Sequence, residues 1–264
     1  MRKETDLLKI KGLILDMDGV LWRELTPIVD LPATFAAIRQ RNLRVVLATN
    51  NSSKTPLAYQ SRLHSLGVEL DQSQILTSSL AVADLLHRRF PNGGKIYLIG
   101  ESGLQAALEE RGFVISADNP LAVVVGIDRQ INYEKLTAAT LLIRSGIPFY
   151  ATNPDRTFPT PEGLIPGAGA ILAALETATD QQPIIAGKPH TALLEVSLQR
   201  LGTQPQETLM VGDRLETDIL GGQNAGCQTA LVLSGVATHA QALQMQPPPD
   251  YIADNLYELI QALD

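Results

Sequence analysis

The sequence predicts an α/β fold organised around a doubly wound parallel sheet. Short apolar runs, among them 13–15, 43–49 and 208–212, alternate with stretches of helical periodicity along the whole chain. This βαβα alternation is typical of parallel strands that helices cover on both faces. Several of the runs end abruptly in polar residues. We therefore expect those residues at the carboxyl ends of strands, where open α/β sheets bind their ligands.

The first part of the chain begins with a strand over 13–15 and a loop or small flap over 20–28. Asp30 is a predicted N-cap, Pro32 suits the first helical turn, and Asn42 is a predicted C-terminal cap. Beyond them we expect strands over 43–49, 95–100, 113–116, 121–127 and 147–152, with helices over 55–67, 79–89, 103–111 and 132–144.

The second part of the chain opens with a predicted long polar loop over 153–167. The alternation of strands and helices then resumes. We expect strands over 183–187, 208–212 and 228–234, and helices over 168–178, 190–201 and 255–263.

The composition argues against several classes of protein. The 21 Lys and Arg residues and 28 Asp and Glu residues give a net charge of −7, so neither nucleic acid nor an anionic membrane is an expected partner. The single cysteine, Cys227, excludes an internal disulfide and fits a reducing compartment. No apolar run approaches the roughly 20 residues of a membrane helix, and the start of the chain lacks the apolar core of a signal peptide. We therefore expect a cytoplasmic protein.

Two carboxylates follow the first predicted strand. Asp16 and Asp18 come directly after an apolar run, where two acidic side chains are costly unless positive charge lies beside them. A magnesium ion and a phosphate ester would supply that charge and a reason for the pair. Asp16 could then attack phosphorus while Asp18 handles the proton of the leaving oxygen. Alternatively, the pair is an Asp-rich turn in which Gly19 adopts a positive φ.

Three other predicted strands end in residues suited to the same chemistry. Thr49 and Asn50 offer a hydroxyl and an amide to phosphate oxygens, and Lys188 offers a cation. Asp213 and Asp218 offer carboxylates to magnesium, which prefers hard oxygen ligands. Each has a structural alternative: a turn with a helix cap, a surface lysine at a helix start, and acids at a helix N-terminus. These alternatives do not explain why all of them occur, each behind an apolar strand.

The segments DMDGV, TNNSS, GKP and GDRLETD resemble the four motifs of the haloacid dehalogenase (HAD) superfamily of phosphatases. The residues of these motifs are similar to those of the NagD and 4-nitrophenylphosphatase branch, subfamily IIA. ATNPDRTFP and PGAG in the middle of the chain resemble the same branch, so the resemblance covers almost the whole chain. It implies a Rossmann-like HAD core over 1–91 and 183–264, with an α/β cap domain inserted over 92–182.

The resemblance also implies roles for the site residues. Asp16 would be the nucleophile that forms an aspartyl-phosphate, and Asp18 the general acid and then the general base. Mg²⁺ would be held by the Asp16 carboxylate, the Asp18 backbone carbonyl and Asp213, with Asp218 orienting the waters of the metal. The phosphate group would be held by Thr49, Asn50, Asn51 and Lys188.

The cap implied by the resemblance would close over the site and select the substrate. Its substrate loop is expected at Asn153, Asp155, Arg156 and Phe158, where the Asp–Arg pair could contact a polar leaving group. Alternatively, these two charges only hold the loop in place. Relatives that act on pyridoxal phosphate carry a histidine near the position of Phe158, which argues against that substrate.

The leading functional hypothesis is a magnesium-dependent phosphomonoesterase for small phosphorylated metabolites, such as phosphoglycolate or a sugar phosphate. 4-Nitrophenyl phosphate is the expected model substrate. A phosphotransferase or mutase would use the same aspartyl-phosphate chemistry. A phosphorylation-switched receiver domain also pairs an acceptor Asp with magnesium, Thr and Lys on a doubly wound sheet, although such domains are much shorter than this chain. The resemblance further suggests a homodimer formed through the cap.

Overall fold

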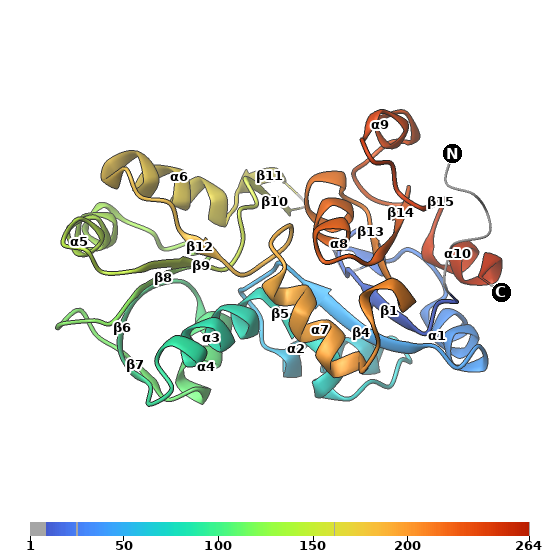
Figure 1. Ribbon diagram of the computed structural model, residues 1–264, viewed down its shortest axis with the longest axis horizontal. Coiled ribbons are helices and arrows are strands. Elements are labelled where there is room, and N and C mark those ends of the chain that lie inside the picture. Colours follow the sequence, from blue (N-terminus) through green and yellow to red (C-terminus); the bar gives the residue numbers. More distant parts are fainter. Residues whose placement is uncertain (1–8, 25, 161, 264) are drawn as a thin grey trace. The chain divides into compact units, whose positions relative to one another are not determined.

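The chain forms two compact units in a computed structural model that describes residues 9–24, 26–160 and 162–263 (Figure 1). The first unit comprises the described parts of Met1–Ala48, Gln60–Leu76 and Lys188–Asp264. The second comprises the described parts of Thr49–Tyr59 and Thr77–Gly187. The segment 92–182 lies within this second unit. The domain boundaries drawn from the sequence stay a prediction.

The first unit is built on a six-stranded sheet in the order β15–β14–β13–β1–β4–β5. Its strands are β1 (Gly12–Leu15), β4 (Arg44–Thr49), β5 (Ile75–Thr77), β13 (Thr208–Gly212), β14 (Gln228–Val232) and β15 (Tyr251–Ala253). The four pairings from β15 to β4 are parallel, and Leu15 lies opposite both Leu47 and Val211. The chain starts at the centre of the sheet, leaves towards one edge and returns on the other side of β1. The direction of winding therefore reverses between β1 and β13, which is where open α/β sheets bind ligands.

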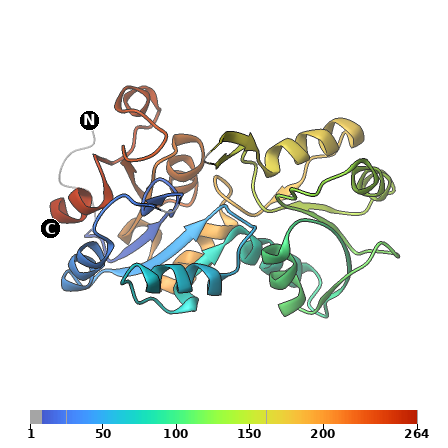
Figure 2. The ribbon, with the colours of Figure 1, turned by 180° about the vertical axis from the view of Figure 1, so that it is seen from behind.

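Helices cover both faces of this sheet, as the doubly wound prediction requires. They are α1 (Leu31–Gln40), α2 (Pro56–Ser65), α7 (Ala192–Leu201), α8 (Leu220–Asn224), α9 (His239–Gln244) and α10 (Leu256–Ala262). The predicted cap of α1 is confirmed, because the Asp30 side chain accepts a hydrogen bond from the Ala33 amide at 2.9 Å. β1–α1–β4 and β13–α8–β14 cross the sheet in opposite directions, so right-handed crossovers place α1 and α8 on opposite faces. α10 packs beside α1 in both views (Figures 1 and 2).

The second unit contains a separate five-stranded parallel sheet in the order β12–β9–β8–β6–β7. Its strands are β6 (Gly94–Ile99), β7 (Phe113–Ile115), β8 (Val123–Val125), β9 (Phe149–Ala151) and β12 (Ile184–Ile185). Its helices are α3 (Ser78–Arg89), α4 (Ser102–Glu110), α5 (Tyr133–Arg144) and α6 (Ala168–Thr179). Figure 1 shows α5 and α6 on one side of the sheet and α3 and α4 on the other. The unit therefore has an α/β core of its own, centred on residues such as Val123, Val125 and Leu175.

The predicted long loop over 153–167 is partly wrong. It contains an antiparallel hairpin of β10 (Thr157–Thr160) and β11 (Gly163–Pro166), in which Phe158 lies opposite Ile165. Both strands contain a proline, which lacks a backbone N–H donor and is uncommon in strands. The sequence of this segment is therefore typical of a loop. The short elements β5, β15 and α9 were also not predicted. The flap expected over 20–28 is a small hairpin of β2 (Trp22–Arg23) and β3 (Thr26–Pro27).

None of the helices in the described part of the chain is long and apolar enough to cross a lipid bilayer.

Candidate active site

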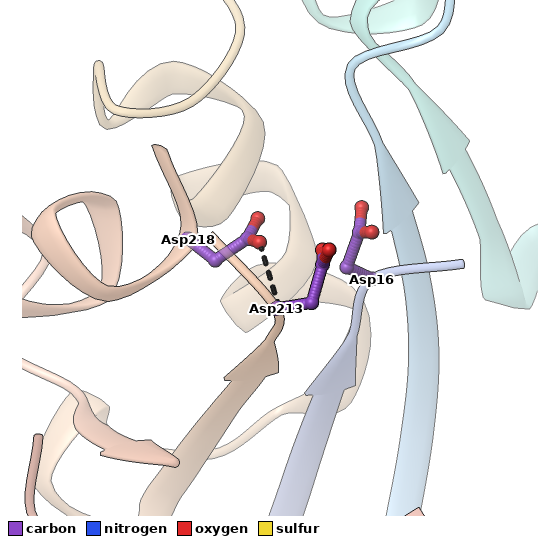
Figure 3. A group of neighbouring side chains, drawn as sticks. All are labelled: Asp16, Asp213 and Asp218. Atoms are coloured by element: carbon purple, nitrogen blue, oxygen red, sulfur yellow. Dashed lines mark hydrogen bonds between the residues drawn. The ribbon is translucent and has the colours of Figure 1, made fainter. Parts of the chain in front are cut away.

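Three buried carboxylates meet at the point where the winding of the first sheet reverses. Asp16 follows β1 and Asp213 follows the neighbouring strand β13, while Asp218 lies in the short π-helical turn Leu215–Ile219. One carboxylate oxygen of each residue lies within 4.8 Å of those of the other two. Figure 3 shows the Asp16 and Asp213 side chains leaving adjacent strand ends, with Asp218 facing them. The structure therefore brings together three residues that lie up to about 200 positions apart in the sequence.

Glycines make room for these carboxylates. A Cβ atom on Gly235 would lie 1.9 Å from Oδ2 of Asp213, and one on Gly212 would lie 2.1 Å from the Cβ of Asp218. The backbone amide of Val236 donates to Asp213 Oδ2 at 2.8 Å, so the loop after β14 holds this carboxylate from one side. Side chains larger than glycine at these positions would displace the acidic groups.

Lys188 is the cation of the cluster. Its side chain is 1% exposed, and its Nζ lies 2.7 Å from Asp16 Oδ1 and 2.7 Å from Asp218 Oδ1. It also donates to the Ala48 carbonyl at 2.9 Å. These three acceptors match the three N–H groups of an ammonium. The alternative interpretation of Lys188 as a surface lysine at a helix start is therefore wrong.

The electrostatics of the cluster follow from burial and from the excess of negative charge. Burial raises the pKa of Asp16 well above its ordinary value, and Asp218 and Asp213 add to the rise although Lys188 opposes it. Burial, followed by the Asp218 carboxylate, raises the pKa of Asp213 to about 7. Burial alone would lower the pKa of Lys188, but Asp16 and Asp218 outweigh it and the pKa is raised. The cluster therefore resists full ionisation unless a further cation joins it.

The residues of this cluster fit a divalent cation. Asp213 Oδ1 is buried and has no hydrogen-bond partner among the described residues. Lys188 cannot serve it, because its donors are already directed at three other oxygens. Three ionised carboxylates and one ammonium leave two negative charges, and carboxylates are the ligands that hard divalent cations prefer. An unpartnered buried carboxylate oxygen is costly, and a bound cation would remove that cost.

Asp18 lies in the turn that follows β1, and the flap contacts its carboxylate. The buried indole of Trp22 donates from Nε1 to Asp18 Oδ1 at 3.0 Å. This contact was not predicted from the sequence. The spacing of four residues, with Gly19 (φ 88°) between them, is the only signal in the sequence that could have suggested it.

Three of the four predicted phosphate-binding residues, Thr49, Asn50 and Asn51, belong to the second unit, whereas Lys188 belongs to the first. Thr49 is the last residue of β4, and its hydroxyl accepts from the Asn51 amide at 3.1 Å. The Asn50 side chain donates to Asp155 Oδ1 at 3.1 Å, and the Asn50 carbonyl accepts from the Asn153 side chain at 2.7 Å. Two residues of the predicted substrate loop are thus joined to the TNNSS motif. Their binding roles stay a prediction.

The other two residues of the predicted substrate loop lie further along, at the hairpin. Phe158 is in β10, and the Arg129 guanidinium lies 5.3 Å from the centre of its ring. Arg129 is held in turn by Glu101 at 2.7 Å. The Arg156 side chain is exposed and makes no hydrogen bond or ion pair within the described part of the chain.

Comparison with known proteins gives one consistent result. The haloacid dehalogenase-like hydrolase family matches residues 13–114, and a HAD-hydrolase-like family matches residues 185–259. The 5'-nucleotidase YutF of Bacillus subtilis is 37% identical over 95% of this chain and 97% of its own length. The acid sugar phosphatase of Staphylococcus epidermidis is 36% identical, over 96% of this chain and 98% of its own. The solved structure of NagD from Escherichia coli K-12 is 35% identical, with a TM-score of 0.88 over 95% of this chain and 98% of that one.

The Rossmann-like sheet, the acidic cluster and these matches define the class: the chain belongs to the haloacid dehalogenase-like hydrolases. Within them it is a phosphatase of the NagD-like branch, a hydrolase of phosphoric monoesters. The family resemblance drawn from the four sequence motifs is thereby confirmed.

Proposed function

We propose that this chain is a magnesium-dependent phosphomonoesterase that hydrolyses small-metabolite phosphate esters through an aspartyl-phosphate on Asp16. The observation that carries the proposal is the buried cluster of Asp16, Asp213, Asp218 and Lys188 at the reversal point of the sheet. Asp16 is held by the ammonium of Lys188, so its Oδ1 has a fixed position. A fixed nucleophile beside a cation suits phosphoryl transfer, where positioning and electrostatics supply most of the rate.

The reaction has two steps. In the first, an Asp16 carboxylate oxygen forms a bond to phosphorus while the ester P–O bond breaks, and Asp18 gives a proton to the leaving oxygen. In the second, Asp18 takes a proton from water, whose oxygen attacks phosphorus and releases inorganic phosphate and the free Asp16 carboxylate. Lys188 offsets the negative charge of Asp16 and of the phosphoryl group throughout.

Asp16, Asp213 and the Asp18 backbone carbonyl would hold the magnesium ion, and Asp218 would orient its waters. When bound, the ion would neutralise phosphate charge and fix the oxygens of the phosphoryl group. The unpartnered Oδ1 of Asp213 supports this assignment. Thr49, Asn50 and Asn51 are the proposed phosphate donors, as the motif resemblance implies.

The test of the proposal is phosphate release from 4-nitrophenyl phosphate by the wild type and by Asp16→Asn, with magnesium and with a chelator. We expect magnesium-dependent turnover in the wild type and a loss of at least about 10³-fold in Asp16→Asn, since a removed nucleophile leaves only the remaining machinery. Circular dichroism of both proteins controls for folding. No turnover on any ester by a folded wild type would exclude the hydrolase.

The substrate class is proposed from the relatives. One relative is named a 5'-nucleotidase and another an acid sugar phosphatase. The two are almost equally similar to this chain, at 37% and 36% identity. The panel should therefore contain nucleoside monophosphates, sugar phosphates, phosphoglycolate and pyridoxal phosphate. We expect pyridoxal phosphate to rank low, because Phe158 stands near the position where such relatives carry a histidine.

The phosphotransferase and receiver-like alternatives make different predictions. A transferase would give more phosphorylated product than free phosphate when a second alcohol is added. A receiver-like domain would accumulate a long-lived aspartyl-phosphate that is stable to gel filtration. Rapid release of one phosphate per ester consumed would exclude both.

The predicted homodimer through the cap and the cytoplasmic location are further proposals. Exposed apolar side chains on the second unit support a dimer, among them Tyr133 at 86% and Leu141 at 64% exposure, eight residues apart on α5. Sedimentation velocity of the wild type and of Leu141→Glu tests it. A monomeric wild type at micromolar concentration would exclude a stable dimer.

A further inference from the structure

We infer that Trp22 is a positioning residue for Asp18: its indole fixes the carboxyl group that exchanges protons with the leaving oxygen and with water. The inference rests on the proposed function, because it concerns the proton transfer proposed for Asp18. It adds a residue outside the four motifs, in the segment 20–28 that the sequence predicts as a loop or small flap.

The geometry of the flap brings the indole back onto Asp18. The Gly19 amide donates to the Trp22 carbonyl at 2.8 Å, and the Leu21 amide donates to the Met17 carbonyl at 2.8 Å, which makes a tight turn. The turn directs the Trp22 side chain to Asp18, where the Nε1–Oδ1 distance is 3.0 Å. Trp22 is 0% exposed, so its N–H is shielded from bulk solvent.

Two arginines hold the flap and its indole in place. The Arg62 guanidinium, from α2, stacks on the Trp22 ring at 3.9 Å from the ring centre. Arg62 also donates to the carbonyl of Glu24, at the tip of the flap. Arg23 donates to the Ser234 carbonyl from Nε at 2.9 Å and from Nη2 at 2.6 Å. The indole is therefore packed between a cation and the carboxyl group, with the strand behind it anchored to the loop after β14.

The chemical consequence follows from the indole being only a donor. Oδ1 of Asp18 therefore acts as the acceptor, which favours Oδ2 as the position of a proton, since a carbonyl oxygen accepts better than a hydroxyl oxygen. The hydrogen bond thus favours one side-chain rotamer and one proton position. A carboxyl group without it would distribute its proton over several orientations, only some of which are useful for transfer.

The test compares leaving groups in Trp22→Phe, which keeps an aromatic ring under Arg62 and removes the N–H. An alkoxide leaving group needs a proton from Asp18, whereas 4-nitrophenolate is stable without one. We expect kcat/KM for an alkyl phosphate such as glycerol phosphate to fall about tenfold or more, as for loss of a hydrogen bond to a charged group. For 4-nitrophenyl phosphate we expect less than about a threefold fall. Because kcat/KM includes only the steps up to formation of the aspartyl-phosphate, slow dephosphorylation does not mask the difference.

Equal losses for the two esters, or no loss for either, would overturn the role of Trp22. The wild type separates this result from failure of the proposed function, since absence of magnesium-dependent turnover there would refute the phosphatase itself. Asp18→Asn removes the proton donor itself. It should therefore show the largest fall in kcat/KM for the alkyl ester, and it gives an upper limit for the effect of Trp22→Phe.

A second measurement does not depend on activity or on the stability of Trp22→Phe. Trp22 is the only tryptophan of the chain, so a ¹H–¹⁵N spectrum contains a single indole cross-peak. We expect that peak to be protected from solvent exchange in the wild type, and to shift upfield and exchange faster in Asp18→Ala. Asp254→Ala, at an exposed position in the bend after β15, is the control and should leave the peak unmoved. An indole peak that is the same in Asp18→Ala and in the wild type would refute the hydrogen bond.

Discussion

Lys188 carries the only positive charge in direct contact with the acidic cluster among the described residues, and it is buried with it. Removal of one partner from a buried ion pair leaves an uncompensated charge and costs about 3–5 kcal/mol. We therefore expect Lys188→Met to lower the free energy of unfolding by about that amount, less whatever Asp16 and Asp218 recover by taking up protons. Urea unfolding at pH 7 measures it.

Lys135→Met is the matched control for that substitution. Lys135 pairs with Asp128 at the same distance, 2.7 Å, but its side chain is 35% exposed. Solvent screening reduces such a pair to about 1 kcal/mol or less. Equal losses in the two variants would contradict the special role of burial at Lys188.

The pKa of Asp213 predicts how the stability of the metal-free protein depends on pH. Its folded-state pKa is raised to about 7, above the ordinary value of 3.8, so the folded protein binds this proton more tightly than the unfolded chain does. The resulting stability is complete below the unfolded pKa and is lost as the pH rises through about 7. In the presence of a chelator we therefore expect the Tm to fall between pH 5 and pH 8. The raised pKa of Asp16 acts in the same direction.

Two comparisons check the origin of that fall. Asp213→Asn should flatten the profile, because the amide does not titrate. Magnesium should raise the Tm more at pH 8 than at pH 5, since it binds the ionised carboxylates. A chelated wild type whose Tm rises from pH 5 to pH 8 would contradict the assignment.

Asp16 and Asp213 could be selected from the sequence because each follows an apolar run that becomes a buried strand, and Asp218 lies five residues beyond Asp213. The proximity of Asp16 and Asp213 follows once their two strands are parallel neighbours, an arrangement that a doubly wound sheet allows. The hydrogen bond of Trp22 could not be predicted in the same way. It depends on how the turn around Gly19 folds back, and the periodicity of the sequence carries no information on that.

At the level of single elements, the loop after β14 holds the Asp213 carboxylate in place. Gly235 leaves no room for a side chain beside Asp213. Gly235→Ala should push that carboxylate out of place and raise the magnesium concentration for half-maximal activity about tenfold or more, as for other residues that support a metal ligand. Val236→Ala is the control, because it keeps the backbone N–H that donates to Asp213 and changes only an exposed side chain. Identical magnesium dependence in the two variants would contradict the argument.

The elements that the sequence predicted well are those with an apolar face and a marked end. The predicted helices over 79–89 and 132–144 correspond to α3 and α5, each of which begins at a side-chain N-cap, Thr77 and Asn132. The elements that it missed are short or irregular. β5 and β15 have three residues each, too few for any periodicity to show, and the prolines of the β10–β11 hairpin resemble those of a loop.

At the scale of the whole molecule, the two sheets differ in whether they are built from separate segments of the chain or from one continuous segment. The five-stranded sheet and its four helices come from one continuous segment, 77–187. We expect this segment, expressed alone, to fold and unfold cooperatively in a thermal melt followed by circular dichroism, and to lack phosphatase activity.

A shorter fragment tests where that unit ends. Residues 92–182 lack α3, which packs on α4, and the edge strand β12. We therefore expect a lower Tm than for 77–187, or no cooperative transition. Equal stability of the two fragments would instead favour the boundaries drawn from the sequence.

The position of β1 at the centre of its sheet has a consequence for the order of events on the ribosome. β1, which Asp16 follows, is synthesised about 190 residues before β13, the neighbouring strand that Asp213 follows. At about 5–20 residues per second, the first strand waits roughly 10–40 seconds for its neighbour. During that interval the growing chain holds a strand with an open edge and an acidic residue without its cation. We therefore expect any chain released before β13 to be inactive and to expose the edge of β1 that β13 covers in the complete sheet.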